Sequence, residues 1–470
     1  METISHVTRV LSKQFDGAAS AQEINSSTIE LGPTEGHVLQ RHEVADLVPD
    51  TSSDYQDEDK GLEFPEGGWM AWRVTLGSFF GLFVVLGIIN AVGAIQAYVE
   101  ENQLANLPAS TVAWIFSINT FMTYFFSIQC GQLFDMYGPY PLLAVGSFLI
   151  VLGFMLTSLC VEFWQFVVCF GIVCGLGSSI CLTPAVAIIG DWFKAKRGTA
   201  TGAATIGGSL GGAVIPIMLR SMYSSVGYGW AVRTLGFLSL ACMAICIWLV
   251  KPRFERSHDK NNRSFWQLYV TDVLDFRCLK DKRFAALCFA ATFSEIALLI
   301  SLTFFTSFCI KSGISQNYSY ILLTIMNAVG MVGRYLPAWI SDRLGRFNTM
   351  IIMTLGASLA MWIMWLPFGT HRGALTAFAV VYGFFTGSIL SLIPVCCGQI
   401  SKTSEYGRRY GVMNFFIAFG ALGGVPISGA LIFGTNYDYL IIFNAILSTI
   451  GCLGWIIART ACVKFKICKV

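Results

Sequence analysis

The sequence predicts an all-α membrane protein whose twelve transmembrane helices form two repeats of six. Of its 470 residues 55% are apolar and only 13% are charged, whereas soluble domains have roughly 25% charged residues. The mean hydropathy is +0.63. Residues 251–283 contain nine Lys or Arg and divide the apolar stretches into two sets of six. This pattern favours two helical bundles joined by a basic cytoplasmic connector.

Each apolar stretch is long enough to cross a bilayer as a helix, which needs about 20 residues. A helix satisfies its own backbone hydrogen bonds in hydrocarbon, and the stretches are about twice the length of a barrel strand. The predicted spans are 72–98, 111–133, 140–161, 163–189, 198–220, 229–250, 284–309, 317–340, 347–368, 372–400, 408–434 and 436–458.

The basic residues predict the orientation. Connections after even-numbered spans, together with the C-terminal tail, contain 21 Lys or Arg, whereas the odd-numbered connections contain three. Because cytoplasmic loops are enriched in Lys and Arg, both termini are expected in the cytoplasm.

The expected domain organisation follows from these patterns. Residues 1–66 contain 14 Asp or Glu and four Lys or Arg without a sustained apolar period, so a disordered acidic cytoplasmic tail is predicted over 1–68. The other predicted parts are a six-helix bundle over 69–250, a basic linker over 251–283, a second bundle over 284–458 and a cytoplasmic tail over 459–470.

An internal repeat supports the two halves. Asp135 is followed three residues later by Gly138, and Asp342 is followed by Gly345 at the same spacing, 207 residues further on. The Gly-rich fifth and eleventh spans also match, because Gly202 and Gly411 are 209 residues apart. Two repeats of the same orientation with six spans each are the arrangement of major facilitator transporters.

Three segments carry a resemblance to a known family. They are PEGGWMAW (Pro65–Trp72), WFKAKRGTATGAATIG (Trp192–Gly207) and the Asp-Arg-x-Gly-Arg loop Asp342–Arg346. With these motifs the chain resembles the major facilitator superfamily and, within it, the monocarboxylate porter family, particularly its fungal members. The resemblance covers Pro65–Ala458 and implies the major facilitator fold. It also implies a carrier of the kind found in the fungal branch, which includes uptake carriers and exporters of secondary metabolites.

The chain departs from that family at two charged positions. Proton-coupled animal members have a Lys inside span one and an Asp four residues before the Arg of span eight. Here span one has no charge over Gly81–Tyr98, and Gly330 stands four residues before the retained Arg334. The resemblance therefore does not carry over the proton-coupling residues of the animal carriers, and it leaves export of a more apolar cargo open.

Two ionisable residues lie inside predicted spans. Such groups cost at least about 2.5–3.5 kcal/mol in hydrocarbon, so each needs a reason to be there. At a rise of 1.5 Å per residue, Glu295 in span seven and Arg334 in span eight differ in depth by about 7 Å, which two long side chains can bridge. We hypothesise that Arg334 binds a substrate anion or polar group and that Glu295 is its alternating partner, with proton transfer left open. A static ion pair, or an Arg reaching the membrane interface, is the competing interpretation.

Polar and charged residues near the expected cavity and loops complete the candidate site. The amides line the predicted cavity or bond a neighbouring helix. The charged loop residues are expected to make and break cytoplasmic contacts between helices as the halves rock, with Lys196 and Arg197 fitting first the enrichment of basic residues in cytoplasmic loops and second such a contact. The candidate cavity amides are Asn90, Gln96, Asn119, Asn327 and Asn414, and the candidate gating residues are Asp135, Asp342, Arg343, Arg346, Lys196 and Arg197.

The predicted function is secondary active transport of a small organic acid or carboxylate-bearing metabolite by alternating access, with export of a fungal secondary metabolite as one form of it. The alternatives are a transporter-like receptor that senses a metabolite without moving it, and a membrane enzyme. None of the five His residues lies in a span, which disfavours an enzyme and a metal site. The expected partners are a small molecule and the lipid bilayer, with no cofactor and no nucleic acid. The plasma membrane is the expected location, with the vacuolar membrane as the alternative.

Overall fold

The computed structural model describes residues 64–254, 276–369, 371–432 and 437–463, all of which belong to one compact unit. Within these ranges every regular element is helical. Twelve helical stretches are long and apolar enough to cross a membrane. The predicted fold class is therefore confirmed.

The first six spans are formed by helices whose ends differ from the prediction by a few residues. The second and fourth spans are built from consecutive short helices. They are α2 (Gly68–Glu101), α3 (Ala109–Phe125) with α4 (Ser127–Tyr137), α5 (Pro139–Thr157), α6 (Phe163–Phe166) with η3 (Val167–Cys174), α7 (Gly175–Ala187) and α8 (Ile189–Trp192), then α9 (Arg197–Ser225) and α10 (Gly227–Leu249).

The last six spans follow in the same way, and π-helical turns interrupt the fourth and ninth spans. The elements are η5 (Phe276–Lys280), α11 (Lys282–Lys311), α12 (Gln316–Leu344), α13 (Arg346–Ala360) with η6 (Met361–Trp365) and α14 (Leu366–Phe368), then α15 (Arg372–Gln399), η7 (Thr403–Glu405), α16 (Tyr406–Ala430) and α17 (Asp438–Val463).

Several helices extend beyond the predicted spans, because a helix continues past its apolar window into polar residues. For example, α2 begins at Gly68 and ends at Glu101, beyond the predicted 72–98. The predicted acidic tail up to residue 63, the middle of the basic linker and the last seven residues lie outside the described residues. The domain boundaries stay predictions.

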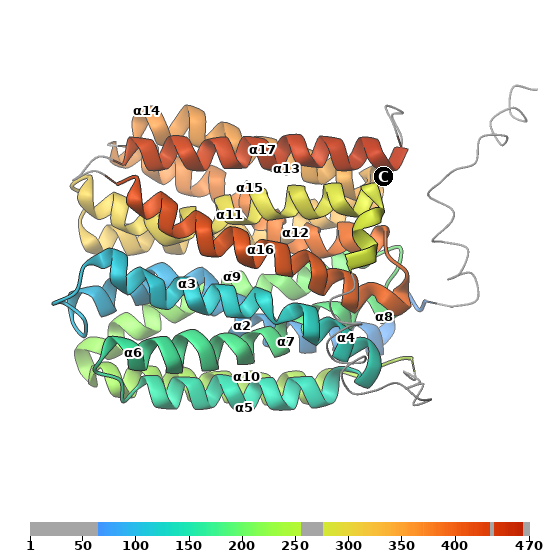
Figure 1. Cartoon of the computed structure of the whole chain (residues 1–470), viewed down its shortest axis with the longest axis horizontal. Helices are drawn as coiled ribbons and strands as arrows, with labels where there is room; N and C mark the ends of the chain where they lie inside the picture. Colours follow the sequence, from blue (N-terminus) through green and yellow to red (C-terminus); the bar gives the residue numbers. More distant parts are fainter. Residues whose placement is uncertain (1–63, 255–275, 370, 433–436, 464–470) are drawn as a thin grey trace, which may run out of the picture. The chain divides into compact units, whose positions relative to one another are not determined.

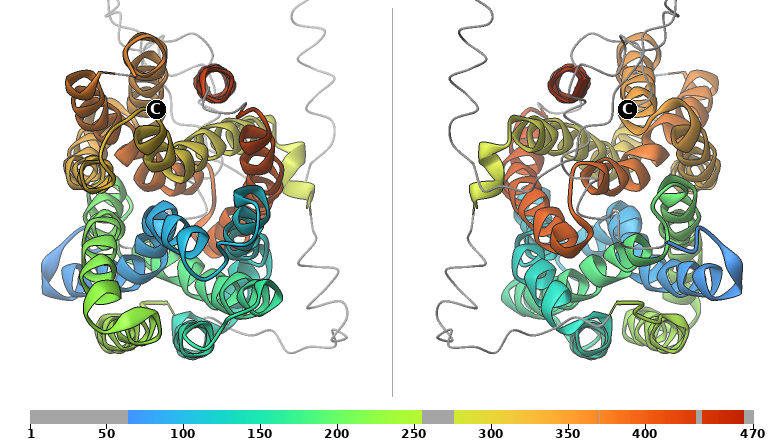
Figure 2. Two further views of the ribbon diagram at one scale, coloured as in Figure 1. Left: turned by 90° about the vertical axis from the view of Figure 1, so that its left-hand side faces the viewer. Right: turned by 90° about the vertical axis from the view of Figure 1, so that its right-hand side faces the viewer.

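The two sets of helices lie side by side. In Figure 1 the blue-to-green helices α2–α10 occupy the lower part of the view and the yellow-to-red helices α11–α17 the upper part. Figure 2 views them along their length and separates the same two groups. We call residues 64–254 the N-terminal half and residues 276–463 the C-terminal half. The halves meet mainly where α9 packs against α12 and where α16 packs against α3 and α4.

Glycines explain how closely α9 approaches its neighbours. A Cβ atom added at Gly211 would overlap the carbonyl oxygen of Phe83 on α2, and one added at Gly202 would lie 2.7 Å from the carbonyl oxygen of Arg334 on α12. Small residues allow such contact between membrane helices. The glycines of α9 thus allow it to pack closely against α2 and α12.

Candidate functional site

Two buried charges lie where the halves meet. Glu295 on α11 and Arg334 on α12 are only 2% and 3% exposed. The hydroxyl of Tyr124 on α3 donates a hydrogen bond of 2.7 Å to Oε1 of Glu295. Nη1 of Arg334 donates one of 2.8 Å to the carbonyl oxygen of Thr205 on α9. Each charge of the C-terminal half is thus hydrogen-bonded to the N-terminal half.

No direct ion pair joins Glu295 and Arg334 in the described part of the chain. Nε of Arg334 is buried and has no hydrogen-bond partner. A buried polar group without a partner carries a free-energy cost. Arg334 retains an unused donor inside the molecule.

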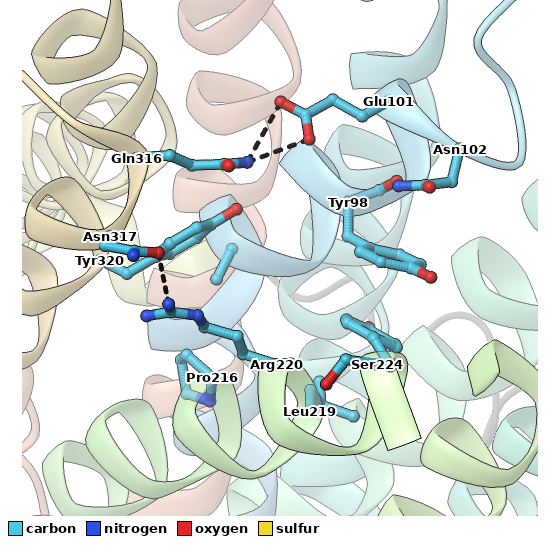
Figure 3. A pocket seen from close by; sticks show the side chains of 12 residues that line it. Tyr98, Glu101, Asn102, Pro216, Leu219, Arg220, Ser224, Gln316, Asn317 and Tyr320 are labelled. Carbon is cyan, nitrogen blue, oxygen red and sulfur yellow. Dashed lines mark hydrogen bonds between the residues drawn. The ribbon is translucent and has the colours of Figure 1, made fainter. Parts of the chain in front are cut away.

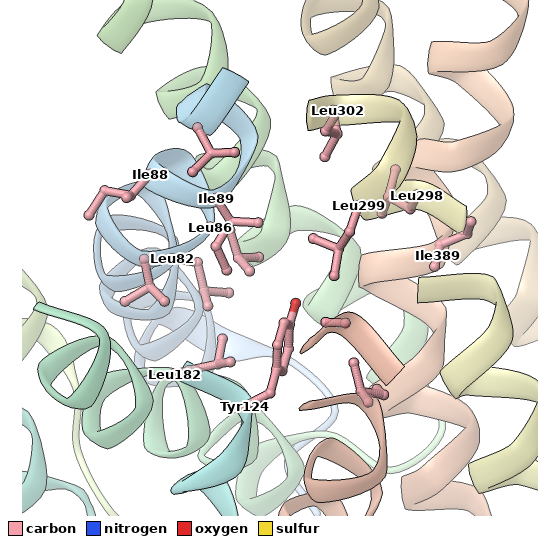
Figure 4. Packing of buried hydrophobic residues seen from close by; sticks show 14 of the residues in the cluster. Leu82, Leu86, Ile88, Ile89, Tyr124, Leu182, Leu298, Leu299, Leu302 and Ile389 are labelled. Carbon is pink, nitrogen blue, oxygen red and sulfur yellow. The ribbon is translucent and has the colours of Figure 1, made fainter. Parts of the chain in front are cut away.

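A small cavity of about 20 Å³ lies beside Glu295. It is bounded by Tyr124, Glu295, Tyr410 and Asn414 together with apolar side chains of both halves. Figure 4 shows Tyr124 reaching from its helix into the space between Leu86 and Leu299. Nδ2 of Asn414 donates a 2.9 Å hydrogen bond to Ser127 in the other half. The structure therefore brings Asn414, Glu295 and Tyr124 together.

Asn90 and Asn327 lie on either side of the α9 glycines. Nδ2 of Asn90 donates to the carbonyl oxygen of Gly208 at 3.0 Å, and Nδ2 of Asn327 donates to that of Gly212 at 3.4 Å. A Cβ atom added at Gly208 would lie 2.9 Å from Nη1 of Arg334. Absence of side chains at these glycines leaves room for the polar groups next to Arg334.

Gln96 and Asn119 lie away from this cluster. Nε2 of Gln96 donates to Glu100 at 2.7 Å, and Gln96 lines a separate cavity of about 10 Å³. Nδ2 of Asn119 donates to the carbonyl oxygen of Phe170 at 2.8 Å, which ties α3 to the fourth span. The structure does not bring Asn119 to the central cavity.

Two aspartates join the halves at one end of the bundle, which we call the basic end (residues 135–139, 193–199, 338–346 and 398–409). The carboxylate of Asp342 accepts hydrogen bonds from the backbone N–H groups of Gly198 and Thr199, at 2.9 and 2.8 Å, and from the Thr199 hydroxyl at 2.7 Å. The carboxylate of Asp135 accepts from the N–H groups of Gly407 and Arg408 at 3.2 and 2.8 Å. Asp342 holds the start of α9 and Asp135 that of α16, as the internal repeat implies.

The basic candidates of the gate have different positions. Arg346 pairs with Asp342 at 4.0 Å and donates to the carbonyl oxygen of Lys194 at 2.6 Å. Arg197 is 4% exposed and lies over the ring of Tyr406 in the other half, 5.0 Å from its centroid. The Lys196 side chain is exposed, and Arg343 lies over Trp339 of its own helix at 4.1 Å.

Glu66 was not anticipated as part of this end. Its carboxylate accepts the backbone N–H groups of Lys194, Ala195 and Lys196 at 2.8, 2.6 and 2.9 Å. The left-handed backbone of Glu66, with φ 52°, is rare for a residue with a side chain. Glu66 belongs to the PEGGW motif, but nothing in that motif indicates that the Glu66 side chain binds residues 194–196.

A larger cavity of about 330 Å³ lies at the other end, which we call the opposite end (residues 94–104, 216–228 and 311–320). Figure 3 shows its walls, which come from α2, α9 and α12. Gln316 donates to both carboxylate oxygens of Glu101, at 3.3 and 3.0 Å, and Arg220 donates to Asn317. Both contacts join the two halves.

The fold and this arrangement define a class of protein: a membrane transporter with two helical halves, polar groups buried between them and contacts between the halves at both ends. The sequence profile of the Major Facilitator Superfamily matches residues 74–396 and 338–463. The chain belongs to this superfamily.

Relatives and solved structures agree with this assignment. A riboflavin transporter of Saccharomyces cerevisiae is 38% identical over 95% of this chain and 88% of its own length. An aspyridones efflux protein of Emericella nidulans is 32% identical over 78% of this chain and 73% of its own. The crystal structure of a human organic anion transporter has a TM-score of 0.66 at 13% identity, covering 83% of this chain and 99% of that one. The chain is thus a multi-pass membrane transporter with a small-molecule substrate, and the alternative of a receptor without transport is not favoured.

Proposed function

We propose that the chain carries riboflavin, or a closely similar polar heteroaromatic compound, by alternating access around Glu295 and Arg334. The main support for this position of the site is a pair of hydrogen bonds. Through them the buried Glu295 and Arg334 side chains each bind the N-terminal half. The substrate class is supported by the riboflavin transporter that is similar over 95% of this chain.

The chemistry of the cluster suits such a cargo. The ring system of riboflavin has a neutral edge with alternating acceptors and an N–H donor. Arg334 offers donors that include an unpaired Nε, the Glu295 carboxylate is an acceptor, and the amide of Asn414 is both. In the closed structure the adjoining cavity measures about 20 Å³, which is room for about one water molecule. Substrate must therefore bind when the halves separate.

A carboxylate-bearing metabolite is the second candidate cargo. Nε and a terminal nitrogen of an Arg form parallel donors that match a carboxylate, and Nε of Arg334 is free of partners. Under this alternative the chain belongs to the monocarboxylate porter branch and Glu295 carries the coupled proton. An efflux relative supports export of a secondary metabolite as a variant of the same candidate.

We also propose an orientation and a location. The 21 Lys and Arg in the even-numbered connections and the C-terminal tail, against three in the odd-numbered ones, favour a cytoplasmic basic end. Both termini then face the cytoplasm, in the plasma membrane or alternatively in the vacuolar membrane.

The test is exchange of labelled riboflavin in liposomes that contain the purified chain. Exchange against unlabelled riboflavin does not depend on the physiological direction of transport. We expect exchange by the wild type, and a decrease of about tenfold or more for Arg334→Lys, because an ammonium cannot replace the planar donors of Arg. Arg233→Lys is the matched control, because Arg233 on α10 bonds Ser158 of its own half, outside the proposed site.

The outcomes separate the two candidates. Exchange of lactate or pyruvate but not riboflavin, lost in Arg334→Lys, would favour the carboxylate cargo. Glu295→Gln then tests whether transport is coupled to protons. If Glu295 carries the proton, a pH gradient should no longer speed up substrate uptake by this variant, whereas exchange of labelled for unlabelled substrate should persist. Riboflavin exchange that is unchanged in Arg334→Lys would contradict the assigned site.

A further inference from the structure

The cavity at the opposite end, which we call the vestibule, has the features of a second ligand site. Its volume of about 330 Å³ falls in the range of small-molecule pockets, about 300–1,000 Å³. Its floor is apolar and includes Ala94, Pro216 and Leu219, and its rim is polar and exposed. A cavity with an apolar floor and a polar rim suits a ligand with a ring at one end and polar groups at the other.

One wall of the vestibule is a stack of tyrosine rings. Tyr98 on α2 and Tyr223 on α9 stack with ring centroids 3.6 Å apart and planes 14° apart. Tyr228 lies parallel to Tyr98 at 6.1 Å and 4°. Parallel aromatic faces bind flat rings by stacking, which depends on shape and a π face more than on a particular hydrogen bond. A flat heteroaromatic ring is the ligand that extends such a stack.

A polar atom in this wall has no partner. Oη of Tyr223 is buried and makes no hydrogen bond, although Tyr223 lines the vestibule. A buried hydroxyl without a partner costs free energy. Once the Tyr223 ring turns towards the vestibule, a carbonyl, ring nitrogen or hydroxyl of a bound ligand can supply the missing hydrogen bond.

The rim presents one charge of each sign. Glu101 on α2 and Arg220 on α9 are both exposed, and in the described part of the chain neither forms an ion pair. Instead each is hydrogen-bonded to an amide of α12, at Gln316 and Asn317 (Figure 3). Exposed hydrogen bonds to side-chain amides are readily replaced by hydrogen bonds to a ligand, so the rim can bind the polar tail of a cargo.

One face of α9 connects the vestibule with the central charges. Arg220, Pro216, Gly212 and Gly208 follow one another at intervals of four residues, so they share a face of the helix. Arg220 and Pro216 line the vestibule, and a Cβ added at Gly212 would lie 2.7 Å from Oδ1 of Asn327. Gly208 lies against Nη1 of Arg334. At 1.5 Å per residue this path is about 18 Å long.

We propose that the vestibule is a second binding site on the transport path, which holds the flat ring of a heteroaromatic cargo against Tyr98 and Tyr223 before or after it occupies the central site. The choice of riboflavin as the probe rests on the proposed function. The site itself rests on the tyrosine stack, the unpaired hydroxyl and the α9 face.

The experiment counts binding sites on the full-length purified chain by equilibrium dialysis with labelled riboflavin, beside the exchange assay in liposomes. We expect two bound molecules per wild-type chain. Tyr223→Phe keeps the stacked ring and removes only the hydroxyl, so it should weaken one of the two sites about three- to tenfold, the usual worth of one hydrogen bond. Its thermal stability should not fall, because the lost hydroxyl had no partner.

Two further variants complete the design. Arg334→Ala should abolish the other site and leave the vestibule site intact. Tyr335→Phe is the matched control, because Tyr335 is on α12, is 41% exposed and lies outside the vestibule lining. It should change neither site.

The failures are distinguishable. One bound riboflavin and normal exchange, with Tyr223→Phe silent, would overturn the vestibule site and leave the proposed function standing. Binding that Tyr223→Phe weakens, without any exchange, would overturn riboflavin transport and keep the vestibule site. Absence of both binding and exchange would overturn both proposals.

Discussion

The two ends of the bundle join the halves by different chemistry. At the basic end, the carboxylates of Asp135 and Asp342 accept backbone N–H groups at the starts of α16 and α9. At the opposite end, exposed side chains meet, with Gln316 bonded to Glu101. The vestibule of about 330 Å³ lies at this second end.

These contacts hold the basic end more firmly than the opposite end. A carboxylate that accepts backbone N–H groups at a helix start combines charge-assisted hydrogen bonds with the helix dipole, whereas exposed side-chain pairs contribute roughly 0–1 kcal/mol. Helix backbones also meet at the basic end, where a Cβ added at Gly407 would lie 2.6 Å from the carbonyl oxygen of Gly131. The described conformation is therefore tightly closed at the basic end and loosely closed at the opposite end.

The largest expected effect is that of Gly131→Ala. A Cβ atom at this position would overlap the carbonyl oxygen of Gly407, and neither backbone can yield as a side chain does. Overpacking costs about 1–3 kcal/mol or more, so the closed basic end should become at least about fivefold to a hundredfold less populated. Hydrogen exchange of the Gly407 and Arg408 amides should speed up, and substrate exchange in liposomes should be nearly lost.

The matched control is Gly423→Ala on α16, because a Cβ there would meet no atom within 4 Å. This variant should behave as the wild type. If Gly131→Ala also exchanged substrate normally, and its Gly407 and Arg408 amides stayed protected from hydrogen exchange, the close approach of the two backbones would not be needed for transport.

An intermediate effect is expected for Asp342→Asn. The variant keeps the shape of the side chain but has one acceptor oxygen in place of two, so its NH2 group meets a backbone N–H of Gly198 or Thr199, donor against donor. A lost charge-assisted bond costs about 1.5–3 kcal/mol, so opening of the basic end should become at least about tenfold more favourable. Hydrogen exchange at the Gly198 and Thr199 amides measures this change.

Asp135→Asn should give a change of similar size at Gly407 and Arg408, because Asp135 occupies the equivalent place in the repeat. Glu66→Gln provides a contrast. Glu66 bonds residues 194–196 of its own half, so its loss should lower stability without favouring opening. Equal opening in Glu66→Gln and Asp342→Asn would show that the bonds between halves are not the controlling contacts.

The sequence predicted the fold and the two central charges for a clear physical reason. A charge inside an apolar span is costly and therefore conspicuous, which singled out Glu295 and Arg334. The repeat of 207–209 residues placed Asp135 and Asp342 in equivalent loops. Their partners were not predictable in the same way, because the backbone N–H groups that they bind are common to every residue.

The aromatic and amide residues show where sequence reasoning ends. Tyr124 resembles every other aromatic residue in an apolar span, and Tyr223 lies just beyond the predicted span 198–220. Only the folded structure places one against Glu295 and the other in the vestibule. Asn119 and Asn414 are both single amides in apolar helices, yet one bonds the fourth span of its own half and the other bonds the opposite half. The rotation of a helix that is apolar on most sides cannot be read from its sequence.

The smallest expected effect is that of Glu101→Gln at the opposite end. Gln keeps an acceptor oxygen for Gln316 and removes only a charge on an exposed side chain. Exposed charge contacts are weak and screened by salt, so the rate of substrate exchange should change by less than about threefold at 150 mM salt, an ionic strength with a Debye length of about 8 Å. A loss comparable with that of Asp342→Asn would mean that the opposite end is held as firmly as the basic end, and the proposed asymmetry between the two ends would have to be abandoned.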